Sequence, residues 1–329
     1  MKTLFPFFAV IVLVLLVFAG VNMAGMQFLF GVVIPYAALA VFLFGVLYRV
    51  VKWGSSPVPF HIPTTCGQQK SLPWIKQNKI ENPSGSLGVI VRMALEVLVF
   101  RSLFRNLKTE LKDGKVVYGL EKWLWMAGLA FHWSFLIILV RHLRFFAENV
   151  PPVIKLIESL DSFLQVGVPL FYITDAVILL AVTYLFFRRV YIPQIKYISL
   201  ASDYFPLFLI LGIAISGVLM RYFFKVHIVG VKQLAMGLVS LKPSIPEGIG
   251  VLFYIHLFLI SVLFAYFPFS KLMHLGGVFL SPTRNLANNS REVRHINPWN
   301  YPVHVHTYEE YENDFRDKMK KAGLPVEKE

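Results

Sequence analysis

The stretch WLWMAGLAFHWSFLIILVRHLR, Trp123 to Arg144, decides the fold of this chain. Residues 123 to 140 carry no formal charge, and at ~1.5 Å per residue an uncharged helix of that length crosses a hydrocarbon core of about 30 Å. A second stretch of the same kind runs from Ile249 to Leu275. Both stretches predict helices that span a membrane.

Each of these stretches carries two histidines, His132 and His142 on the first and His256 and His274 on the second. Imidazole nitrogens in hydrocarbon cost several kcal/mol each unless they are hydrogen-bonded, bound to a metal or open to a cavity. One buried histidine is ordinarily a hydrogen-bonded core residue. Four histidines divided two and two between separate spans indicate a shared ligand.

The composition identifies an integral membrane protein. Of the 329 residues, 56% are hydrophobic and only 16% are charged, and the hydrophobic residues form long uncharged blocks. The net charge of +13 does not indicate nucleic-acid binding, because the basic residues are interspersed with apolar segments. The single cysteine, Cys66, supplies neither a disulfide nor the four ligands of an iron–sulfur cluster, so a cluster requires another subunit.

Hydropathy predicts an all-α membrane bundle of about six transmembrane helices. We place them near residues 4–20, 27–49, 123–144, 166–187, 203–221 and 249–275. The first segment also resembles a signal sequence, but its single basic residue favours a retained helix. The predicted organisation is an N-terminal helix at 1–26, a membrane domain at 27–280 and a polar tail at 281–329.

Two amphipathic segments are predicted outside the spans. The polar insertion at about 50–121 contains a helix whose charged residues recur every four or five positions, which is typical of a helix in the membrane surface. These residues are Arg92, Glu96, Arg101 and Arg105. A second short helix at 150–165 is expected to cover the end of the His142 helix.

The distribution of Lys and Arg predicts the orientation. With six spans and both termini in the cytoplasm, the cytoplasmic segments hold 25 of the 32 basic residues. This asymmetry follows the positive-inside rule for a multi-pass protein of a prokaryotic inner membrane. His132 and His274 then lie in the inner half of the membrane, and His142 and His256 in the outer half.

The spacing of the histidines requires two sites. Ten residues separate the first pair and eighteen the second, which correspond to about 15 Å and 27 Å along a helix, too far for one metal. In antiparallel helices His142 faces His256 and His132 faces His274. Two facing imidazoles inside apolar helices are the ligands of a haem iron, and Arg141 and Arg144 are candidates for binding the propionates of the outer haem. Pro268 is expected to kink the second helix.

The spacings His-x9-His and His-x17-His resemble those of the gamma subunit of respiratory nitrate reductase, a dihaem cytochrome b. The TTCGQQKSLPW loop and the tail SPTRNLANNSREVRHINPWNYPVHVH are similar to the membrane subunit family of the sulfite-reduction-associated complex (DsrM), which is related to the membrane cytochrome of heterodisulfide reductase. The resemblance implies two bis-histidine haem b groups and electron exchange with menaquinone. It further implies a cytoplasmic iron–sulfur partner subunit that acts on a disulfide or trisulfide in dissimilatory sulfur metabolism.

A quinol that gives up two electrons also loses two protons, so its site needs groups that bind or move protons near a haem. At the outer end, Lys155, Glu158 and Asp175 are the candidates, with Lys155 as the first choice for a quinone oxygen. An alternative function is a metal-ion or proton transporter whose histidines form the pathway. Such transporters more often show inverted repeats and several acidic residues at the midplane, where this chain has Asp175.

Overall fold

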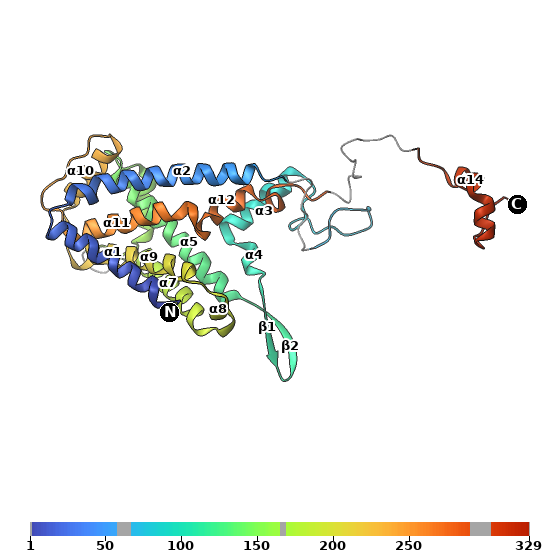
Figure 1. Cartoon of the computed structure of the whole chain (residues 1–329), viewed down its shortest axis with the longest axis horizontal. Coiled ribbons are helices and arrows are strands. Elements are labelled where there is room, and N and C mark those ends of the chain that lie inside the picture. The colour runs from blue at the N-terminus through green and yellow to red at the C-terminus, as the bar shows by residue number, and fades with distance from the viewer. Residues whose placement is uncertain (1, 58–66, 165–168, 290–303, 329) are drawn as a thin grey trace.

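The computed structural model describes residues 2–57, 67–164, 169–289 and 304–328. Cys66 lies outside the described residues. Most of the described chain is helical, and the long helices lie side by side in one bundle from which a two-stranded hairpin projects (Figure 1).

Within these residues, five helices are long and apolar enough to cross a membrane. They are α1 (Leu4–Asn22), η1 with α2 (Leu29–Val33 and Ile34–Gly54), α5 with η2 (Lys122–His142 and Leu143–Phe145), α9 with η3 (Ala201–Val218 and Leu219–Phe223), and α11 with η4 (Val251–Tyr266 and Phe267–Phe269). A further helix, α7 (Ile173–Tyr191), has 19 residues and packs against both α5 and α9, but it carries three charged residues. The prediction of an all-α, multi-pass membrane protein is confirmed.

The bundle is held together by apolar contacts between helices that are distant in sequence. Helix α11 packs against α2, α1 and α9, and α7 joins α9 to α5. Val17, Leu209 and Leu259 are fully buried where α1, α9 and α11 meet. Helix α2 approaches η4 so closely that a Cβ on Gly45 would lie 2.7 Å from the Cβ of Pro268. The small residue at position 45 therefore permits this contact.

The second histidine helix is broken, where a kink was predicted. Helix α11 ends at Tyr266, and the chain passes through η4, which contains Pro268, to an extended residue, Ser270 (φ −114°, ψ 178°). Proline has no N–H and its ring clashes with the preceding turn, so the helix terminates there. The Ser270 hydroxyl accepts from the Leu272 N–H at 3.2 Å and starts η5 (Lys271–Met273), after which His274 begins α12 (His274–Leu280). The expectation that His256 and His274 lie on one continuous helix was wrong.

The insertion contains the amphipathic helix α3 (Ser86–Val99) and the short α4 (Arg101–Phe104). Its charged side turns into the protein, since Arg92 and Glu96 are buried. The exposed stripe is apolar and consists of Leu87, Ile90, Val91 and Leu98. The sequence predicted a helix with one charged face, and the structure shows that this face turns inward because of what its charges bind.

The buried charges of α3 fasten the start of the C-terminal tail, which includes α13 (Pro282–Asn285). The Arg92 guanidinium donates to the backbone carbonyls of Glu81, Arg284 and Leu286, and the Arg284 guanidinium pairs with Glu96 at 2.7 Å. The first residues of the tail are therefore packed against α3 and belong to the folded part of the chain.

Glu81, in the loop before α3, belongs to the same network because its backbone carbonyl accepts from Arg92. Its carboxylate is paired with Arg101, at 2.9 Å, and with Arg105. Burial alone would raise the pKa of Glu81, but the hydrogen bonds and charges of the two arginines outweigh it, and the pKa lies below its ordinary value.

The hairpin in the insertion was not predicted. Strands β1 (Leu107–Lys112) and β2 (Lys115–Leu120) pair antiparallel, from Leu107 opposite Leu120 to Lys112 opposite Lys115. Asp113 and Gly114 at the turn have φ of 51° and 73°, as a two-residue type I′ hairpin requires. The remaining described helices are α6 (Pro152–Asp161), α8 (Pro193–Ile198), α10 (Ile228–Val239) and α14 (Tyr308–Lys321). Of these, α6 is the predicted cover helix, and it packs against α5.

Candidate functional site

The four membrane histidines form two pairs. The ring centres of His142 and His256 lie 6.3 Å apart with nearly parallel planes, at 22°. Those of His132 and His274 lie 5.9 Å apart with nearly perpendicular planes, at 87°. We call these the outer pair and the inner pair. Although α11 is broken before His274, the chain still brings this residue beside His132.

All four rings have their Nδ1 atom engaged. Nδ1 lies 2.7 Å from a backbone carbonyl oxygen in both His132 and His142, and 2.9 Å from one in His274. A carbonyl only accepts, so Nδ1 carries the proton in these three rings. This tautomer leaves an unprotonated Nε2, which is the form of imidazole that binds a metal.

In the fourth ring, His256, Nδ1 lies 2.8 Å from the Ser216 hydroxyl of α9. That hydroxyl is also within hydrogen-bond distance of the carbonyls of Gly212, at 2.8 Å, and Ile213, at 3.0 Å. Because a hydroxyl has one proton and uses it toward a carbonyl, it accepts from Nδ1 of His256. The next residue, Gly217, leaves room for the ring, since a Cβ there would lie 3.3 Å from Cε1 of His256.

The inner pair is framed by Phe100, at the end of α3, and by aromatic residues of α5. Phe100 adopts a left-handed conformation, with φ 52° and ψ 49°, which costs an aromatic residue of order 1–3 kcal/mol. Its ring packs edge-on against His132 at 4.9 Å between ring centres. The indole N–H groups of Trp125 and Trp133 donate to the last carbonyls of α3, those of Val99 and Leu98. These bonds hold α3 against α5 beside His132.

The ring separation in each pair matches that of two imidazoles bound to one metal ion. A metal–imidazole bond of ~2.0 Å and a ring centre ~1.1 Å beyond the nitrogen place two opposed axial imidazoles about 6 Å apart. The two ring separations of 6.3 and 5.9 Å agree with that value. In the part of the chain that the structure describes, no group of three or more His, Cys, Asp or Glu side chains converges as a bare metal ion would need. Two protein ligands suffice when a porphyrin supplies the other four.

The two arginines predicted to bind propionates are engaged with acidic residues. Arg141 is buried and donates to Asp161 at 2.7 Å and to Asp175 at 2.8 Å. Asp161 also accepts from the N–H and hydroxyl of Thr174. Arg144 is more exposed and pairs with Glu158 of the cover helix at 2.9 Å. Arg141 therefore joins α5, α6 and α7 at the outer end of the bundle.

The three residues predicted for the quinone occupy different environments. Lys155 is exposed on α6, and Glu158 is half-buried in its ion pair with Arg144. Asp175 is buried in the first turn of α7, where it accepts from Arg141 and from the Tyr222 hydroxyl at 2.9 Å. All three lie on elements near the outer pair.

Sequence reasoning overlooked two further residues at the outer pair, Tyr172 and Arg221. Tyr172 is buried, and its ring lies 3.7 Å from the Arg141 guanidinium and 3.9 Å from that of Arg221. Two guanidiniums cannot share one face at these distances, so the ring lies between them. Arg221 belongs to the π-helical turn η3, and its place at the end of an apolar span was the signal that could have singled it out.

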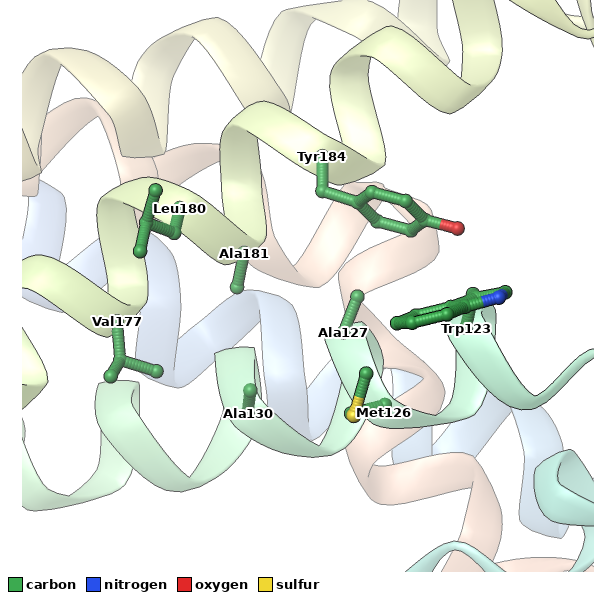
Figure 2. Close-up of a pocket in the computed structure, with 8 residues that line it drawn as sticks. All are labelled: Trp123, Met126, Ala127, Ala130, Val177, Leu180, Ala181 and Tyr184. Atoms are coloured by element: carbon green, nitrogen blue, oxygen red, sulfur yellow. The ribbon is translucent and has the colours of Figure 1, made fainter.

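A separate apolar hollow of about 260 Å³ lies between α5 and α7 (Figure 2). Small residues form its floor, and Trp123 and Tyr184 lie together at one end. The lining residues are Trp123, Met126, Ala127, Ala130, Val177, Leu180, Ala181 and Tyr184. None of them belongs to the histidine pairs, so the hollow is separate from the candidate site.

Comparison with known proteins places this geometry in a family. The family model described as nitrate reductase gamma subunit matches residues 89–295, a range that includes all four histidines. The chain is 44% identical over 278 residues to the "Hdr-like menaquinol oxidoreductase cytochrome b-like subunit" of Archaeoglobus fulgidus, which covers 82% of this chain and 83% of that protein. It is 41% identical over 273 residues to the subunit of the same description from Archaeoglobus profundus, with 81% of each chain covered. The chain therefore belongs to the nitrate reductase gamma subunit family of membrane proteins.

Proposed function

We propose that this chain is the dihaem b-type cytochrome subunit of a quinone-linked membrane complex. His142 and His256 would hold the iron of an outer haem, and His132 and His274 that of an inner haem, each through Nε2. The observation that carries the proposal is the pairing of the four rings with every Nδ1 committed to an acceptor. Bound haem would supply a one-electron carrier at each depth, so that electrons cross the membrane in single steps.

The chain's own residues orient the ligands. The carbonyl and hydroxyl acceptors hold each imidazole in one tautomer and restrict its rotation about the Cβ–Cγ bond. At the inner pair, Phe100 and Phe131 pack edge-on against His132 and restrict the position of its ring. At the outer pair, Ser216 fixes His256, which is 8% exposed.

We further propose that electrons are exchanged with menaquinone near the outer pair. Both relatives are described as subunits of a menaquinol oxidoreductase. Lys155 and Glu158 on the cover helix and Asp175 beneath it are the groups that would bind a quinone oxygen or accept its protons. Because Asp175 already accepts from Arg141 and Tyr222, a proton that it accepts would weaken both contacts. The variants Lys155→Ala and Asp175→Asn are expected to slow reduction by a menaquinol analogue while both haems are retained.

The electron partner is proposed to be a cytoplasmic iron–sulfur subunit of the heterodisulfide reductase type, acting on a disulfide or trisulfide in dissimilatory sulfur metabolism. The distribution of Lys and Arg supports cytoplasmic termini, which places the insertion and the tail on the side of the inner pair. The contacts of Arg92 and Arg284 hold the start of the tail against α3, close to α12 and His274. Such a surface would dock the partner within electron-transfer distance of the inner haem.

A visible spectrum of the purified chain tests the proposal. A b-type cytochrome shows sharpened absorption bands on reduction with dithionite, and a menaquinol analogue is expected to produce the same bands more slowly. A chain without these bands that transported a metal ion or protons would instead support the transporter alternative.

A further inference from the structure

Among the residues that the structure describes, Arg221 has no polar partner, although it lies beside the outer pair. Its Nε is buried and makes no hydrogen bond, and none of the described residues forms an ion pair with its guanidinium. Its guanidinium lies 3.9 Å from the centre of the Tyr172 ring. Leaving a buried N–H group without an acceptor is costly, so the stacking fixes the position of Arg221 while its Nε–H stays unpaired.

The neighbouring cations differ from Arg221 in this respect. Arg141, on the opposite face of Tyr172, donates to Asp161 and Asp175, and Arg144 pairs with Glu158. The residue after Arg221, Tyr222, donates to the same Asp175 that Arg141 binds. The carboxylates of this cluster are thus directed at Arg141 and Tyr222. The guanidinium of Arg221 therefore has donors available for an anion other than Asp161 and Asp175.

Arg221 lies close enough to the outer pair to act on it. Its guanidinium stacks on Tyr172, and the same ring is contacted by Arg141, the residue that precedes His142 in the chain. An anion at this place must reach the edge of an apolar bundle, and a haem carries two carboxylates at its polar edge. A carboxylate accepts two parallel hydrogen bonds from one guanidinium, which is the geometry that arginine offers.

We propose that Arg221 binds a propionate carboxylate of the outer haem, and that Tyr172 holds its guanidinium in place for that contact. The assignment rests on the proposed function, and it replaces Arg141 and Arg144 as the candidates for this role. Arg221 makes the contact through its own donors, whereas Arg141 serves as a positioning residue that supports the far face of Tyr172.

The test is a redox titration of the purified, quinone-free chain, with the haems followed by their visible spectrum. Arg221→Gln removes a positive charge that disfavours the ferric state, so one of the two titration steps is expected to move to lower potential. A tenfold change in the equilibrium corresponds to 59 mV for one electron. Arg221→Lys keeps the charge and is expected to recover most of the shift. Arg144→Gln, at a residue already paired with Glu158, is expected to leave both steps unchanged.

Each outcome decides the question. A shift of one step in Arg221→Gln, with the other step in place as proof of folding, supports the assignment. Two unchanged steps overturn it, as does an equal shift in Arg144→Gln. If Arg221→Gln does not accumulate, Arg221→Met, which also removes the charge, takes its place under the same criterion: a shift of one step supports the assignment, and two unchanged steps overturn it. Unchanged haems with slowed menaquinol reduction would assign Arg221 to the quinone instead. A wild-type chain without haem would refute the proposed function itself.

Discussion

Arg141→Leu is expected to destabilise the bundle strongly. The Arg141 side chain is 8% exposed and makes two charge-assisted hydrogen bonds of 2.7 and 2.8 Å to Asp161 and Asp175. Removing one partner from a buried ion pair leaves uncompensated charge and costs about 3–5 kcal/mol. The loss of the stacking on Tyr172 adds to this cost.

Arg144→Leu is the matched control, three residues further along the chain. Its side chain is 42% exposed and pairs with Glu158, so its loss is expected to cost about 0–1 kcal/mol. The assay is reversible unfolding of the purified chain in mild detergent titrated with dodecyl sulfate. Adding Asp161→Asn and Asp175→Asn to Arg141→Leu is expected to recover part of the loss, because no carboxylate is then left unpaired. Equal losses in the two single arginine variants would refute the reasoning.

Three further predictions concern the rest of the bundle. Since the pKa of Glu81 is lowered on folding, its stabilising effect is present above the ordinary carboxyl pKa and is lost as the pH falls through the lowered value; the difference in thermal midpoint between wild type and Glu81→Gln should therefore shrink from about pH 7 to about pH 3. Truncation after Asn289 should leave the thermal midpoint unchanged. Truncation after Leu280 removes the carbonyls of Arg284 and Leu286, which accept from the buried Arg92, and should cost about 3–5 kcal/mol in the same unfolding assay. Gly45→Ala should cost about 1–3 kcal/mol by overpacking, while Gly54→Ala, with nothing within 4 Å of its Cβ, should be neutral; equal effects would contradict the close contact of α2 with η4.

Five of the six predicted spans coincide with the long apolar helices of the described residues, because long uncharged segments have few alternatives in a bilayer. The histidine positions also came from the sequence, since polar rings are conspicuous within such segments. The break at Pro268 was foreseen only as a kink, because the extended conformation of Ser270 depends on the contacts of the following turn. The direction of the α3 charges was missed for a similar reason: a helical period shows that charges share a face, but not whether that face meets water or a buried carbonyl.

The residues around the outer pair show the same limit. Arg141 and Arg221 are both arginines at the end of an apolar span, and nothing local distinguishes them. Their difference arises from Asp161 and Asp175, which lie on other helices and reach only Arg141. Which arginine remains available to a ligand is therefore a property of the tertiary structure.

The most direct test of the central claim is the haem content of the purified chain and of four single variants, His132→Ala, His142→Ala, His256→Ala and His274→Ala. Wild type is expected to hold two haems per chain and each variant one. His142→Ala and His256→Ala should retain the same haem, with one spectrum and one potential, and His132→Ala and His274→Ala should both retain the other. A His132→Ala chain that kept two haems, or variants of one pair that retained different haems, would contradict the pairing.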